Sequence, residues 1–238
     1  MPDCSTQEFL SIVVPTLNEA ENVEPLVRQI FASAPDCGEI VFVDDRSVDG
    51  TPDRVRELAG EFPVRVVERE NPTLGLSGAV IAGAREARGD LLLVMDADLS
   101  HPPEEIANLV RPLIEDRADI VIGSRYINGG STPGWPVYRK AMSRVAAGFA
   151  YPLTGVHDSM CGFFALRRAV LLELAPEATG FKIAFEAIVR GRGRLRVLEV
   201  PILFRDRQRG SSKMSLRVAI LFGFRWLAVA GRIVFGRR

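Results

Sequence analysis

The sequence predicts an α/β fold in which helices flank a mostly parallel sheet. Short apolar segments alternate with segments of helical pattern through the first half of the chain, and the connections between them are short. Several apolar segments stop abruptly at acidic residues, as residues 91–95 do at Asp96 and Asp98. This alternation predicts right-handed crossovers between parallel strands, with ligands bound where the strands end.

The predicted elements alternate from residue 9 to residue 124. An apolar strand at 9–15 ends at Pro15, and Asn18 and Glu21 have the spacing of a capping box for a helix over 23–33. The further strands of this half are expected at 39–44, 64–68, 90–95 and 120–124. The further helices are expected at 51–59, 75–87 and 103–115.

After Arg125 the regular alternation ends. Residues 128–134 are rich in glycine, serine and proline, which indicates a loop. The remaining helices are expected at 139–153, 167–174 and 181–190, and the remaining strands at 161–166 and 195–204. The polar, basic stretch 207–213 is expected to be a loop, and no linker is long enough to separate independent domains.

The composition is that of an ordinary globular protein, with 47% hydrophobic and 25% charged residues among 238. Thirty basic and thirty acidic side chains cancel, so the footprint of a nucleic-acid-binding protein is absent. Cys4, Cys37 and Cys161 have no disulfide or zinc-site spacing, which favours a reducing cytosol. The polar, acidic start of the chain predicts no signal peptide.

The last segment, 214–238, is strongly apolar but contains Arg217, Arg225 and Arg232. On a helix these arginines fall on one side, which predicts an amphipathic helix lying in a membrane interface rather than spanning the bilayer. Its arginines would face anionic head groups. A helix packed on its own domain or on a partner protein is the alternative.

The pair Asp96 and Asp98 is the first candidate for chemistry. Two carboxylates at the carboxyl end of a strand can converge on one divalent cation. Asp-x-Asp alone is a weak signal, because a solvated turn with an aspartate capping the next helix gives the same pattern. The pair by itself leaves both interpretations open.

The ordered set of strand ends is much more specific than the acidic pair. It comprises VPTLNE at 14–19, VDDRSVDGT at 43–51 and DADLSHPPE at 96–104, and it resembles the GT-A family 2 glycosyltransferases. The narrower resemblance is to their dolichyl/polyprenyl-phosphate mannose synthase branch, supported by GL at 75–76, GSRY at 123–126, GW at 134–135, YRK at 138–140 and the 204–213 stretch. The run 157–163 matches the family at Asp158, Gly162 and Phe163 but departs at Met160 and Cys161.

The resemblance implies a GT-A (Rossmann-like) catalytic domain over 1–213, followed by the amphipathic helix at 214–238. It also implies a role for each matching residue. The nucleotide-sugar ligands would be Pro15, Leu17, Glu19, Asp44, Asp45, Asp96, Ala97 and Arg207. Asp96 and Asp98 would hold Mg²⁺ or Mn²⁺, with Ser100 as a third ligand. For Asp45 and Asp49, hydrogen bonding within their own turn is the alternative.

The acceptor phosphate would be bound by four basic residues and one serine: Arg125, Arg139, Lys182, Lys213 and Ser143. Asp98, Arg125 and Arg139 are the expected catalytic residues. A polyprenyl phosphate is already anionic, so it requires positioning and charge balance rather than a general base, and guanidinium groups supply both.

The expected reaction is an inverting, metal-dependent transfer of a hexose to a polyprenyl or dolichyl phosphate at the cytoplasmic face of the cell membrane. GDP-mannose is the expected donor, and UDP-glucose or another sugar nucleotide is the alternative. A sugar nucleotidyltransferase is a more distant alternative, but it would show a glycine-rich, basic loop after the first strand, where residues 15–22 are acidic. A non-catalytic binding protein would show a degraded arginine set or acidic pair. A Rossmann dehydrogenase would show G-x-G-x-x-G there.

Two kinds of partner follow from this expectation, besides the two substrates. One is the membrane surface. Since no pair of transmembrane segments follows residue 235, the other is a separate membrane protein.

Overall fold

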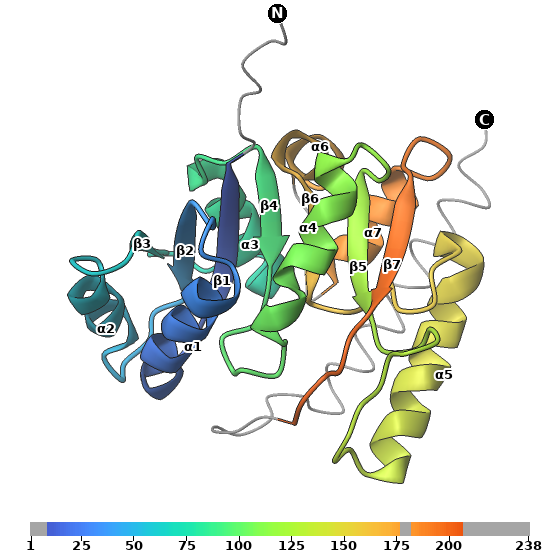
Figure 1. The fold of residues 1–238 in the computed structure, drawn as a ribbon, viewed down its shortest axis with the longest axis horizontal. Helices are drawn as coiled ribbons and strands as arrows, with labels where there is room; N and C mark the ends of the chain where they lie inside the picture. Colours follow the sequence, from blue (N-terminus) through green and yellow to red (C-terminus); the bar gives the residue numbers. More distant parts are fainter. Residues whose placement is uncertain (1–8, 177–181, 207–238) are drawn as a thin grey trace, which may run out of the picture.

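The computed structural model describes residues 9–176 and 182–206, which form one sheet covered by helices on both faces (Figure 1). The strands are β1 (Leu10–Thr16), β2 (Glu39–Asp44), β3 (Val64–Glu68), β4 (Leu91–Val94), β5 (Ile120–Ser124), β6 (Phe164–Arg167) and β7 (Val197–Pro201). The helices are α1 (Ala20–Ser33), α2 (Thr51–Leu58), α3 (Gly75–Glu86), the short 3-10 helix η1 (Pro103–Glu105), α4 (Ile106–Ile114), α5 (Val137–Thr154), α6 (Arg168–Leu174) and α7 (Ile183–Arg190).

The seven strands have the order β3-β2-β1-β4-β6-β5-β7. All neighbouring pairs are parallel except those of β6, which runs antiparallel to β4 and to β5. The predicted mostly parallel α/β sheet is therefore confirmed. The antiparallel insertion brings Phe164, at the start of β6, beside Val94 of β4 and Ile122 of β5.

The central strands are buried on both faces. In Figure 1, α1 and α4 lie in front of the sheet, and α3, α6 and α7 lie behind it. Leu91, Leu92 and Leu93 of β4 are fully buried between these layers. Burying one such side chain contributes about 1.5–3 kcal/mol, which explains why this short strand is continuously apolar. The strand is thus a rigid base for the two aspartates that follow it.

Several element boundaries differ from the sequence prediction. The expected strand at 161–166 begins only at Phe164, and the expected strand at 195–204 is limited to β7. The predicted capping box at Asn18 and Glu21 is wrong: α1 begins at Ala20, and Asn18 has a φ of 57°. The Asn18 side chain accepts a hydrogen bond from the Val48 amide instead, which is a contact between two loops.

The described residues end at Asp206, so the predicted helix at 214–238 lies outside them. Arg207 and Lys213 lie outside them as well. Among the helices of residues 9–176 and 182–206, none combines the length and the apolar character that a membrane span requires.

Candidate active site

The predicted site residues that fall within the described parts of the chain gather at one rim of the sheet. The carboxyl ends of β1, β2, β4 and β5 meet the amino end of β6 there, because β6 runs in the opposite direction. The loops that follow the parallel strands and the loop that precedes β6 therefore converge. α5 and the start of α7 add further side chains to this rim.

The loop after β2 is held in place by its own acidic side chains. Asp44 is 1% exposed, and its carboxylate accepts hydrogen bonds from the amide of Ser47 at 2.8 Å and from the hydroxyl of Ser47. The Asp49 carboxylate accepts from the amides of Ala20 and Thr51, each at 3.0 Å. The alternative that Asp49 bonds its own turn is confirmed. For Asp44, contact with a nucleotide stays a prediction, and its observed contacts fix the shape of the loop.

Asp45, in contrast, forms an ion pair with Arg69, the residue that follows β3. Its Oδ1 lies 2.8 Å from Nη1 of Arg69. Burial raises the pKa of the Asp45 carboxyl, and Arg69 partly offsets that effect. Nearby, Glu19 accepts a hydrogen bond from the side-chain amide of Asn22 at 2.8 Å, and Leu17 is exposed. Leu17, Glu19 and Asp45 thus lie on adjacent loops at the β1–β2 side of the rim, and their binding of a nucleotide stays a prediction.

Asp96 and Asp98 follow β4 but differ in exposure. The Asp96 side chain is 36% exposed, whereas Asp98 is 3% exposed and Ala97 between them is buried. Oδ1 of Asp98 accepts hydrogen bonds from the amide of Ser100 at 3.1 Å and from its hydroxyl at 2.5 Å. Ser100 therefore orients Asp98. A hydroxyl oxygen that donates retains lone pairs, so metal ligation by Ser100 stays a prediction.

His101 supports the same turn from the interior. Its Nδ1 accepts a hydrogen bond from the Asp96 amide at 2.9 Å, and its ring stacks on Phe163 with centroids 5.1 Å apart. Burial lowers the pKa of His101, although the neighbouring Asp96 and Asp98 oppose that shift. The imidazole is therefore neutral near pH 7, as its acceptor role at Nδ1 requires.

The acidic pair fits a divalent cation that is shared with a bound ligand. Within the described parts of the chain, no three His, Cys, Asp or Glu side chains come together as a metal cluster. Mg²⁺ is commonly bound by one or two carboxylates, and substrate phosphates complete its coordination. Asp96 and Asp98 supply such oxygens, and the partial exposure of Asp96 allows a diphosphate to approach.

A small pocket lies beside Asp96, between α3 and the start of α7. The lining residues are Pro15, Leu76, Val80, Val94, Asp96, Cys161, Gly162, Phe164, Lys182, Ile183 and Ala184. Lys182 donates a hydrogen bond from Nζ to the Met160 carbonyl at 2.7 Å. Burial lowers the pKa of Lys182, and the positive charge of Arg125 acts in the same direction. The pocket thus brings an ammonium group close to Asp96.

Arg125, directly after β5, is anchored by Asp158 from the loop before β6. Its Nε and Nη2 donate to the two carboxylate oxygens at 2.7 and 2.8 Å, and its amide donates to Oδ2 at 2.9 Å. Burial lowers the pKa of Arg125, but the hydrogen bonds and charge of Asp158 outweigh it, so the net direction is upward. The guanidinium is a fixed positive charge in a partly enclosed place.

Arg139 and Ser143 lie one turn apart on α5, beside Arg125. The guanidinium of Arg139 lies 3.9 Å from the ring centroid of Trp135, and the guanidinium of Arg125 lies 5.5 Å from the same centroid. Ser143 accepts a hydrogen bond from the Tyr126 hydroxyl at 2.5 Å. The structure therefore brings Arg125, Arg139 and Ser143 together around two aromatic rings.

α5 presents an apolar side to solvent next to these arginines. The exposed apolar side chains of this helix are Val137, Tyr138, Met142, Val145, Phe149 and Tyr151. Tyr138, Met142, Val145 and Phe149 recur at helical spacing, so they form one stripe, which we call the α5 stripe. Arg139 lies at the amino-terminal end of this stripe.

Sequence reasoning assigned no role to Asp158, Trp135, His101 or the α5 stripe. The three single residues lie inside the motifs that supported the resemblance, so the sequence did mark them as candidates for the site. The sequence could not show which residues pair when they lie far apart in the chain, as Arg125 and Asp158 do. Arg207 and Lys213, predicted for the same site, lie outside the described residues.

Known proteins resemble this chain in sequence and in fold. Residues 11–175 match the model of Glycosyl transferase family 2. A dolichol-phosphate mannosyltransferase of Pyrococcus furiosus is 43% identical over 86% of this chain, and the chain spans 59% of that protein's length. A polyprenol monophosphomannose synthase of Mycolicibacterium smegmatis is 38% identical over 96% of this chain and 89% of its own. Glucosyl-3-phosphoglycerate synthase of Mycobacterium tuberculosis, solved with Mn²⁺, UDP and phosphoglyceric acid, has a TM-score of 0.73 at 21% identity, covering 94% of this chain and 78% of that one.

Proposed function

The chain belongs to glycosyl transferase family 2, and on that premise we propose that it transfers mannose from GDP-mannose to a polyprenyl or dolichyl phosphate. The names of the two relatives, a dolichol-phosphate mannosyltransferase and a polyprenol monophosphomannose synthase, support this substrate class. The observation on this chain that carries the proposal is the position of Arg139, which shares the Trp135 ring with the mostly buried Arg125 and adjoins the α5 stripe.

That position suits an acceptor with an anionic head and a hydrocarbon tail. Arg125 and Arg139 both carry positive charges over the ring of Trp135, where a phosphate can be bound. The α5 stripe begins at Tyr138, the residue next to Arg139, and offers apolar surface for a lipid chain or a membrane. A soluble sugar or protein hydroxyl would leave that apolar surface without a function.

The acceptor chemistry follows from these charges. A phosphate monoester oxygen is already a nucleophile near neutral pH, so no side chain has to remove a proton from it. Arg125, held rigidly by Asp158, and Arg139, stacked on Trp135, would instead orient that oxygen toward the anomeric carbon. Attack from the side opposite the departing diphosphate inverts the configuration of the sugar.

On the donor side, Asp96 and Asp98 would hold Mg²⁺ or Mn²⁺. When bound, such a cation neutralises charge on the departing diphosphate. Ser100 and His101 would keep the two carboxylates in place, through the hydroxyl contact to Asp98 and the ring contact to the Asp96 amide. Leu17, Glu19 and Asp45 would line the base and ribose pocket, and Lys182 would balance negative charge beside Asp96. The manganese bound to the structural relative is consistent with this assignment.

We further assign the reaction to the cytoplasmic face of the cell membrane. A long-chain lipid phosphate is held in a bilayer, and the enzyme must approach its head group from the side on which sugar nucleotides occur. The α5 stripe with Arg139, Lys140 and Arg144 on the same helix combines apolar contact with positive charge for anionic lipids.

The experiment is transfer of radiolabel from GDP-mannose, and separately from UDP-glucose, into purified polyprenyl phosphate in detergent. The proposal expects mannose transfer that EDTA abolishes and manganese restores. Asp98→Asn should lose activity, whereas Asp116→Asn, an exposed aspartate far along the sheet from the rim, should retain it. Transfer from UDP-glucose alone would overturn the donor assignment. Transfer to no lipid phosphate from either donor would overturn the proposed function.

A further inference from the structure

The indole of Trp135 is buried with an unused donor. The residue is 8% exposed, and its Nε1 has no hydrogen-bond partner among residues 9–176 and 182–206. A buried donor without a partner is costly, so native proteins rarely retain one without a reason. Nε1 of tryptophan can only donate, so the missing partner must be an acceptor.

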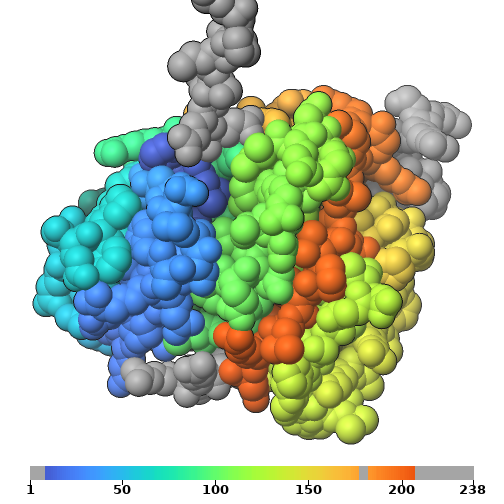
Figure 2. Space-filling view, in the orientation of Figure 1, coloured from blue at the N-terminus to red at the C-terminus, as the bar shows by residue number. Residues whose placement is uncertain are grey.

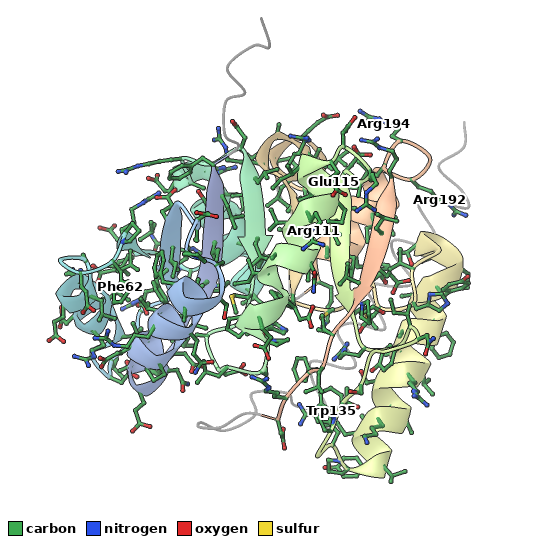
Figure 3. The ribbon with its side chains drawn as sticks, in the orientation of Figure 1. Phe62, Arg111, Glu115, Trp135, Arg192 and Arg194 are labelled. Carbon is green, nitrogen blue, oxygen red and sulfur yellow. The ribbon has the colours of Figure 1, made fainter. Side chains whose placement is uncertain are left out.

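The surroundings of the ring specify the charge of that acceptor. Two cations lie near the indole: the guanidinium of Arg139 at 3.9 Å and that of Arg125 at 5.5 Å from its centroid. Phe204 contacts it edge-on at 5.2 Å and completes the enclosure. Figure 3 labels Trp135 between the start of α5 and the segment that follows β7. Arg125 pairs with Asp158 and Arg139 with Asp206, but each guanidinium keeps further N–H donors, so an anionic acceptor beside the indole is favoured over a neutral one.

The backbone around Trp135 is also arranged for an anion. Pro136 is the N-cap residue of the 18-residue helix α5 and supplies no side-chain cap to the first turn. The first amides of a helix point along its axis and, with the helix dipole, favour a negative group at that end. Trp135 is the residue immediately before this cap, so it adjoins the start of the helix.

We propose that Trp135 binds the acceptor phosphate, with its indole N–H donating to a phosphoryl oxygen that Arg125 and Arg139 hold by charge. The inference rests on the proposed function and deepens it by adding a neutral, directional donor to two charged ones. The ring has a second task, because its two contacts with guanidinium groups keep both arginines at fixed positions. If Trp135 had only a structural role, its ring would position the two arginines but its N–H would not contact the phosphate.

Trp135→Phe separates the two tasks, because it keeps an aromatic ring for the arginines and removes only the N–H. We expect the KM for polyprenyl phosphate to rise at least about tenfold, the loss of one hydrogen bond to a charged group. The KM for GDP-mannose should remain within the error of the measurement, and circular dichroism should show that the variant stays folded. Trp135→Leu, which removes the ring as well, should raise the acceptor KM further and lower kcat.

A binding measurement tests the same contact without turnover. The sequence contains two tryptophans, Trp135 and Trp226, so Trp226→Phe makes the indole of Trp135 the only reporter. Titration with a short-chain polyprenyl phosphate should change its fluorescence, whereas the matching polyprenol, which lacks the phosphate, should not. Equal responses to both lipids would overturn the inference.

The two proposals fail separately. An unchanged acceptor KM in Trp135→Phe, with the native chain active, overturns the role of Trp135 and leaves the transferase assignment intact. A native chain that transfers no sugar overturns the transferase assignment, and the fluorescence titration then still decides whether Trp135 contacts a phosphate.

Discussion

Arg125 and Asp158 meet as a bidentate ion pair in which Asp158 is fully buried and the Arg125 side chain is 10% exposed. The guanidinium donates hydrogen bonds to both carboxylate oxygens, at 2.7 and 2.8 Å, and the backbone amide of Arg125 donates a third. The pair joins the loop after β5 to the loop before β6. It therefore fixes both the direction of the charge and the shape of the rim.

Asp158→Asn should destabilise the protein strongly. The change leaves the charge of Arg125 without its counter-ion in a buried place, which costs about 3–5 kcal/mol in comparable cases. Chemical denaturation followed by circular dichroism measures the loss. Asp206→Asn is the matched control, since Asp206 pairs with Arg139 at the surface, where an ion pair contributes about 0–1 kcal/mol. Equal losses in the two variants would contradict the anchoring role of Asp158.

Asp98→Asn should abolish most transfer without unfolding the chain. Charge stabilisation by a bound divalent cation is worth several kcal/mol, so we expect at least about a hundredfold lower kcat. Isothermal titration with manganese in the presence of GDP should show weaker metal binding in this variant. A variant with normal metal affinity and normal kcat would remove Asp98 from the metal site.

Arg139→Gln should raise the KM for the lipid phosphate more than that for the sugar nucleotide. Loss of one charged hydrogen-bond donor to a phosphate predicts an increase of about tenfold or more. Arg111→Gln, which changes an exposed arginine of α4 to which no role is assigned, should change neither constant appreciably. Steady-state kinetics with each substrate varied separately distinguish the two outcomes, and a selective rise in the donor KM would reassign Arg139 to the donor side.

Phe149→Glu should weaken binding to vesicles that contain anionic lipid. Phe149 is 60% exposed on the α5 stripe, and inserting an aromatic side chain into a membrane contributes about 1.5–3 kcal/mol. Sedimentation with vesicles should show roughly tenfold weaker association, while activity on a short, soluble polyprenyl phosphate stays normal. Ile114→Glu changes an equally exposed apolar residue on α4 and serves as the control. If both variants bind vesicles alike, the α5 stripe is not the membrane contact.

Stability should fall as the pH rises above 9. Burial raises the pKa of the Cys37 thiol from 9.0 to about 12, and burial next to Asp158 does the same for Cys161. Both thiols stay neutral in the folded chain but ionise on unfolding above pH 9, so the unfolded state releases more protons and is favoured. Each thiol should cost about 1.4 kcal/mol at pH 10 relative to pH 8. Urea denaturation of the native chain and of Cys37→Ala/Cys161→Ala at both pH values measures the difference between them.

Local patterns predicted the strands well where burial alone decides them. β2 and β3 begin and end at the residues expected, because their apolar runs lie between polar or turn-forming neighbours. The start of α1 was predicted wrongly because its first amide is bonded by Asp49, which lies on another loop. A capping rule applied to neighbouring residues cannot include a partner that the fold supplies from elsewhere.

The same reason limits the prediction of the site. The acidic pair, Arg125 and Arg139 were named from motifs, but their partners were not. Asp158 stands 33 residues from Arg125 and meets it only because β6 enters the sheet between β4 and β5. Whether Asp44 contacts a ligand or its own turn also depends on the position of Ser47, which spacing alone does not determine.

Figure 2 shows the segment after β7 lying between α4 and the residues that lead into α5. This segment follows the edge strand of the sheet and lies at the rim that carries the candidate site. The strand order adds a less obvious link. The loop that leads into β6 supplies Asp158 to Arg125, and its Gly162 lies beside Asp96, where an added Cβ would be in ordinary contact with the carboxylate at 3.4 Å. On the roles proposed for Asp96 and Arg125, this short loop contacts a binding residue for each substrate. A substitution in the loop would then change the preference for the sugar donor and that for the lipid together, and a library built to change one should be screened for the other.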